Sequence, residues 1–134
     1  MKHIFLAFIF CVALFQWLNP LSVLAEDSLS NAFINHQRNI QVSGYGTVIK
    51  ILSDDNTGFR HQRFILKLLS GQTILIAHNI DLAPKINGIS KGDNIQFYGQ
   101  YEWNNKGGVV HWTHKDPNNR HEHGWLKHNG RIYQ

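Results

Sequence analysis

The sequence has little cysteine, little proline and little charge. Its 134 residues include one cysteine and three prolines, and only 16% of them are Asp, Glu, Lys or Arg. With one cysteine the chain cannot form an internal disulfide, so packing has to stabilise its fold. The 43% of hydrophobic residues exclude disorder along the whole length. The length allows one domain and excludes a multidomain enzyme.

The residue type in excess is histidine. The chain has nine histidines, where roughly three are usual at this length. The formal net charge is +4 with neutral histidines, which is weakly basic and becomes strongly basic on acidification. These two features direct attention to metal ions and to polyanions as ligands.

The first 25 residues have the pattern of a signal peptide. A short positive start precedes an apolar run over residues 4–18, and Pro20 follows it. Val23 and Ala25 occupy the two positions that a signal peptidase reads, which predicts cleavage after Ala25. The run of about 15 residues is shorter than the ~20 that span a bilayer as a helix. We therefore expect a periplasmic or secreted protein with no transmembrane segment after cleavage, no cysteine and a net charge of +3.

After one short helix, the spacing of the hydrophobic residues changes from the helical period to the period of two that is typical of strands. Residues 26–41 predict an N-terminal helix and linker, with the helix over residues 26–40, and residues 42–134 predict a β domain. Five strands are expected, and a final hairpin is signalled by Asn129-Gly130. The expected strands cover residues 45–52, 61–69, 72–78, 95–103 and 109–114. Three meandering strands, a connector over residues 80–91 and two further strands predict a mainly β fold, a small OB-like five-stranded barrel. A generic β-sandwich is the alternative.

Four stretches of sequence resemble a known family. They are GFRHQRFIL at residues 58–66, GQTILIAHNIDLAP at 71–84, FYGQYEWNNKGGVVHWTH at 97–114 and GWLKHNGRIYQ at 124–134. On the basis of these stretches, the chain resembles the small bacterial domain-of-unknown-function family 3465 over roughly residues 41–134. The resemblance implies an exported single-domain protein and brings no established activity.

Histidines and an aspartate gather near the end of the fifth expected strand. The candidate metal ligands are His111, His114, Asp116 and His121. Imidazole and carboxylate groups suit zinc or another divalent ion. On a regular strand the side chains of His111 and His114 point to opposite faces, so joint ligation requires the strand to end at about Thr113. Histidines that fill polar loop positions beside aromatic residues are the alternative.

Other residues suggest binding or catalysis. The binding candidates are Arg63, His78, Glu102 and Trp112, with His61 as a second choice. Aromatic and basic side chains on one face of an OB barrel predict binding of nucleic acid or another polyanion. Tyr101 and Trp103 share strand parity with Ile95 and Phe97, which favours a place in the core.

We therefore expect a small exported binding domain, a monomer, whose ligand lies on a His- and Trp-rich face around the fourth and fifth strands. Nucleic acid, a metal ion or an envelope partner is the expected ligand. The alternative is a small metal-assisted hydrolase that acts on phosphodiesters. No ordered catalytic motif selects a nucleophile, and His78 is equally suited to a buried turn position.

Overall fold

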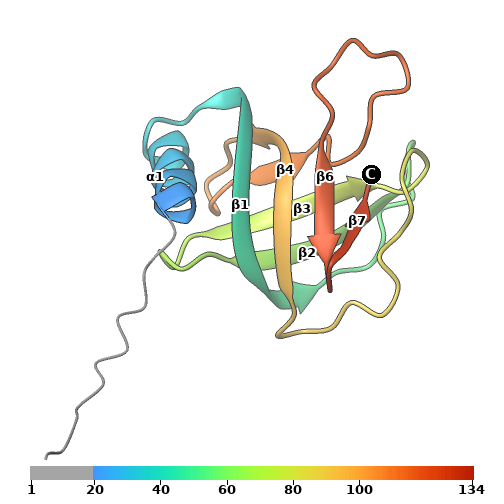
Figure 1. Cartoon of the computed structure of the whole chain (residues 1–134), viewed down its shortest axis with the longest axis horizontal. Coiled ribbons are helices and arrows are strands. Elements are labelled where there is room, and N and C mark those ends of the chain that lie inside the picture. Colours follow the sequence, from blue (N-terminus) through green and yellow to red (C-terminus); the bar gives the residue numbers. More distant parts are fainter. Residues whose placement is uncertain (1–19) are drawn as a thin grey trace, which may run out of the picture.

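The computed structural model describes residues 20–134, which form one helix and seven strands (Figure 1). The elements are α1 (Pro20–Ile34), β1 (Arg38–Ile51), β2 (His61–Lys67), β3 (Thr73–Asn79), β4 (Asn94–Glu102), β5 (Val109–His111), β6 (Trp125–His128) and β7 (Arg131–Tyr133). Among these residues, no helix combines the length and the apolarity that crossing a membrane would require.

The first five strands close into a barrel. They pair in the order β1-β2-β3-β5-β4, and a second pairing between β1 and β4 completes the circle. All pairs are antiparallel except β3 with β5. This is the OB-like barrel that the strand pattern predicts, and the predicted C-terminal hairpin, β6 and β7, extends the sheet from β4.

Strand β1 belongs to two parts of the barrel wall. Its first ten residues pair with β4, and its last five pair with β2. The register shifts between Val48 and Lys50, which is an irregularity of the β-bulge kind. A bulge bends a strand and increases its twist, so this irregularity lets one strand turn from β4 to β2.

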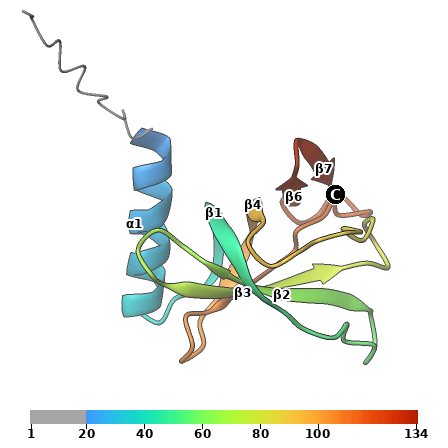
Figure 2. The ribbon, with the colours of Figure 1, turned by 90° about the horizontal axis from the view of Figure 1, so that it is seen from below.

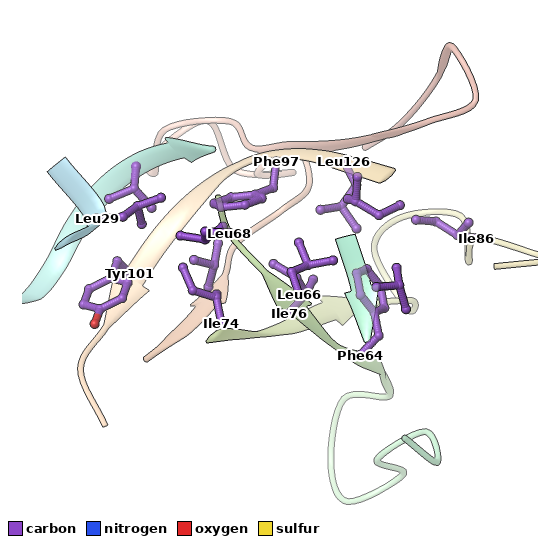
Figure 3. Packing of buried hydrophobic residues seen from close by; sticks show 14 of the residues in the cluster. Leu29, Phe64, Leu66, Leu68, Ile74, Ile76, Ile86, Phe97, Tyr101 and Leu126 are labelled. Atoms are coloured by element: carbon purple, nitrogen blue, oxygen red, sulfur yellow. The ribbon is translucent and has the colours of Figure 1, made fainter. Parts of the chain in front are cut away.

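The core fills the barrel with side chains from alternate strand positions (Figure 3). Phe64, Leu66, Ile74, Ile76 and Phe97 are completely buried. Tyr101 is also completely buried, and its hydroxyl donates a hydrogen bond to the Gly107 carbonyl at 2.9 Å. The parity argument that placed Tyr101 in the core is confirmed, and Trp103 packs against the core from its edge.

Helix α1 covers one end of the barrel, beside the turn between β2 and β3 (Figure 2). Its buried side chains are Leu29 and Ala32. The Gln72 side chain donates hydrogen bonds to the carbonyls of Leu29 at 3.3 Å and Gly107 at 3.0 Å, which ties the helix to two barrel turns.

The helix ends earlier than the sequence predicted. The prediction of a helix over residues 26–40 was wrong at both ends, because α1 begins at Pro20 and stops at Ile34. His36 has a φ of 50°, and the Gln37 amide donates to the Ala32 carbonyl at 2.9 Å. This left-handed residue and six-to-one hydrogen bond are the Schellman arrangement that terminates helices. The freed chain enters β1 at Arg38 instead of residue 45.

Two other strand predictions need correction. β5 ends at His111 instead of His114, because Trp112 adopts a φ of 55° that a strand cannot continue. The expectation that β3 is buried on both sides was also wrong: Ile74, Ile76 and His78 are buried, whereas Leu75 and Ala77 are only half-buried on the outer surface. Most of the predicted signal peptide lies outside the described residues.

Candidate binding face

The predicted His- and Trp-rich face exists as a compact cluster on β4, β5 and the loop of residues 112–124. We call Gln100, Glu102, His111, Trp112, His114 and His121 the histidine–tryptophan cluster. The Trp112 ring stacks on His121, with centroids 3.9 Å apart and an interplanar angle of 10°. It also stacks on His114, at 5.2 Å and 29°. Figure 1 shows the loop extending beyond the barrel before the chain enters β6.

Hydrogen bonds hold this loop against β4. The two ring nitrogens of His121 lie 2.8 Å from the Glu122 carbonyl oxygen and 2.5 Å from Gln100 Oε1. The Tyr98 hydroxyl donates to the Glu122 carboxylate, and this carboxylate raises the pKa of Tyr98. Gly124 passes so close to the Trp112 carbonyl that a Cβ atom there would lie 1.9 Å from its oxygen. These contacts fix the conformation of the loop against the barrel.

Glu102 and His111 form a pair at the edge of the cluster. His111 Nε2 lies 3.7 Å from Glu102 Oε1, which is beyond hydrogen-bond range. The Glu102 carboxylate instead accepts a hydrogen bond from Gln100 Nε2 at 2.9 Å. Burial lowers the pKa of His111, and Glu102 opposes this shift. His111 Nε2 is thus a buried polar atom with no partner among residues 20–134, which costs free energy.

Asp116 organises the tip of the loop. Its carboxylate accepts backbone hydrogen bonds from Asn118 at 3.0 Å, Arg120 at 2.9 Å and His121 at 2.8 Å. These donors, first those of Asn118 and His121, lower the pKa of Asp116 to about 2. Its own amide donates to His123 Nδ1 at 2.8 Å. Asp116 is therefore a turn residue whose oxygens are already engaged.

The structure does not assemble the predicted metal ligands into one site. Within residues 20–134, no three His, Cys, Asp or Glu side chains are arranged to hold a metal ion. His111 approaches Glu102, Asp116 binds backbone amides, and the ring nitrogens of His121 have oxygen partners. His114 donates from Nδ1 to the Lys115 carbonyl at 2.7 Å. The strand does end before His114, as joint ligation with His111 would require, but the two rings face different partners.

His78 lies inside the barrel wall, away from the surface. It is completely buried, and its ring nitrogens lie 2.8 Å from Thr113 Oγ1 and 3.0 Å from the Pro84 carbonyl oxygen. Burial is the largest cause that lowers the pKa of His78 to about 4. The ring is therefore neutral at pH 7 and joins β3 to two loops, which is a structural role.

The outer surface of β2, β3 and β5, which we call the OB face, has a one-sided charge. These three strands contain no Asp and no Glu, whereas they carry Arg63, Lys67, His61 and His111. Register places Ala77 opposite Arg63, and β5 lies on the other side of β3. The centre of the face is half-buried and apolar, formed by Ile65, Leu75, Ala77 and Val109. An apolar strip with cations along β2 suits a chain that has apolar rings and anionic links.

Sequence reasoning missed one residue beside this face. Phe59, at the end of the β1–β2 loop, leaves 62% of its surface exposed. Arg63, which sequence reasoning did select, lies on the OB face and donates from Nε to the Ser53 carbonyl at 3.1 Å. A single aromatic residue after a glycine carries no periodic signal, so only the folded loop shows that Phe59 faces solvent.

The fold and the face together define a small OB-type barrel with a cationic outer surface. The chain belongs to the family described as Protein of unknown function (DUF3465), whose model matches residues 11–134. No curated protein matches the chain.

Proposed function

We propose that this protein is an exported binding module that holds single-stranded nucleic acid, or a polyanion of similar form, across the OB face. The observation that carries the proposal is the absence of carboxylates from β2, β3 and β5, beside four basic or histidine side chains. In OB folds this surface, with the adjoining loops, binds oligonucleotides and oligosaccharides. A phosphate chain is the ligand that a cationic face favours.

The charges of the face are largely free to meet a ligand. The salt bridges of Lys and Arg in the described part of the chain are Arg60 with Asp81 and Lys85 with Asp54, and His111 lies 3.7 Å from the Glu102 carboxylate. Neither Arg63 nor Lys67 takes part in them. The histidine–tryptophan cluster borders the face through His111, which lies on β5.

Charge reversal at Lys67 tests the proposal. We expect the wild-type protein to bind an oligothymidylate of about 20 nucleotides at low salt. Lys67→Glu is expected to weaken binding and to reduce the slope of log affinity against log salt by about one, because one phosphate contact is lost. Fluorescence anisotropy of the labelled oligonucleotide at several salt concentrations measures both quantities.

Lys127→Glu is the matched control, because it makes the same change of charge on β6, outside the OB face. It is expected to leave the salt slope close to that of the wild type. Equal losses in the two variants would show that only net charge matters. No wild-type binding at low salt and pH 5.5 would refute the proposed function.

We also propose that the chain is exported by cleavage after Ala25. Support comes from the sequence pattern and from the packing of α1, whose buried residues Leu29 and Ala32 follow the cleavage point. The mature protein is then expected to begin at Glu26. Mass analysis of the N-terminal peptide from the periplasmic or secreted fraction measures this, and a mature protein that retains Met1 would contradict it.

A further inference from the structure

The β1–β2 loop presents Phe59 on a fixed backbone. Asp55 and His61 exchange two backbone hydrogen bonds of 2.9 Å, which close the loop. Inside it, the Thr57 amide donates to Asp55 Oδ1 at 3.0 Å, and Gly58 supplies a φ of 70°. The loop is therefore a tight turn, and its glycine meets a conformational requirement that other residues rarely satisfy.

The residues next to Phe59 are anchored as well. The Arg60 amide and its Nε atom both donate to the Asp81 carboxylate at 2.8 Å. His61 donates from Nδ1 to the Phe59 carbonyl at 2.8 Å. These contacts fix the backbone that carries Phe59, so little backbone freedom is lost when a ligand binds. The Phe59 ring, largely exposed to water on an anchored turn, is suited to contact a flat apolar partner.

Local charge distinguishes the kind of group that Phe59 contacts. Around the loop, Asp81 pairs with Arg60, and Asp54 pairs with Lys85 at 2.5 Å. The cations outside these ion pairs, Arg63 and Lys67, lie on the adjoining strand β2. The loop also holds the Asp55 carboxylate, which lies outside these two ion pairs. Phosphates are thus favoured along β2, whereas the surroundings of Phe59 suit an uncharged ring.

We propose that Phe59 stacks on an unpaired nucleobase of the strand that the OB face holds. This inference rests on the proposed function and adds that the ligand is bound through its bases as well as its phosphates. Base–aromatic stacking tolerates every base, because each base has a π face. It requires an unstacked base, so Phe59 makes the face selective for single strands over duplexes and over phosphate chains without bases.

Two ligands separate stacking from charge: an oligothymidylate, and an abasic oligonucleotide of the same length. Phe59→Leu is expected to weaken binding of the oligothymidylate about tenfold and to leave binding of the abasic strand unchanged. The salt slope is expected to stay at the wild-type value, because no phosphate contact is removed. Phe59→Tyr, which keeps a ring, is expected to retain most of the affinity.

Tyr45→Leu is the matched control, since Tyr45 is a 40% exposed aromatic residue on β1 at a position paired with β4. It is expected to bind both strands as the wild type does. Thermal midpoints of all variants check that they are folded. If wild type binds and Phe59→Leu loses nothing, or loses equally on both strands, the stacking inference is overturned while the proposed function stands. If wild type binds neither strand, the proposed function itself fails and the inference falls with it.

Discussion

Replacing Phe97 by alanine is expected to lower the free energy of unfolding by about 3–5 kcal/mol, the largest effect of any single substitution considered. Phe97 is completely buried at the middle of β4, where its backbone is paired with Gly44 of β1 and with Leu126 of β6. Its ring occupies the space that a side chain at residue 44 would need, since a Cβ there would lie 2.3 Å from the ring. Urea unfolding at pH 7 measures the loss.

The complementary substitution supplies a control. Gly44→Ala alone is expected to destabilise the protein, because its methyl group would meet both Phe97 and Leu29. In the Phe97→Ala background the same methyl group enters a cavity, so its cost should fall or change sign. Ile132→Ala, at a position 51% exposed, should change stability little. Additive effects of the Gly44 and Phe97 changes would contradict the packing described above.

The second large effect is a loss of stability on mild acidification. Burial holds the pKa of His78 at about 4 in the folded protein, against 6.5 as its ordinary value. Between these pH values the unfolded chain binds a proton that the folded chain does not, so stability falls as pH falls. The stabilisation is complete above pH 6.5, and the expected loss by pH 4 is about 3 kcal/mol. Urea unfolding at half-unit pH intervals measures it.

Variants of two histidines separate this effect from other titrations. His78→Gln is expected to be less stable at pH 7, because it disturbs the hydrogen bonds to Thr113 and Pro84, and to lose most of the slope between pH 6.5 and 4. His36→Gln changes an exposed histidine and should retain that slope. Asp116 acts at lower pH, because its pKa is lowered to about 2 and its stabilisation is lost only as pH falls from its ordinary value near 3.8. A wild-type slope in His78→Gln would refute the assignment.

Most of the barrel could be predicted because it depends on strand periodicity and turn residues. Alternation in β2 and β4 identified the buried sides correctly, including that of Tyr101. The errors at the ends of α1 and β5 came from residues that adopt a left-handed backbone without being glycine. His36 ends α1 and Trp112 ends β5, both with positive φ. Such conformations depend on contacts from distant parts of the chain, which local sequence does not contain.

The candidate site was predicted only in part, because some of its contacts depend on how the loop folds. The sequence placed Glu102, His111, Trp112 and His121 on one face, and the structure brings them together. It could not show that His121 contacts Gln100 or that Asp116 binds amides, because both contacts depend on the fold of the loop. His78 is of a residue type that often binds ligands, but its surroundings are those of a core residue. Only burial distinguishes these roles.

Closure of the barrel has a consequence for how the chain acquires its structure. The wall is completed by pairing β1 with β4 and β3 with β5, and residues such as Val42 and Gly99 that meet in it are far apart in sequence. Such distant pairings require the entropy of long loops to be lost before the contacts stabilise anything. We therefore expect slow folding in one cooperative step, with little stable structure in any fragment that ends before β5.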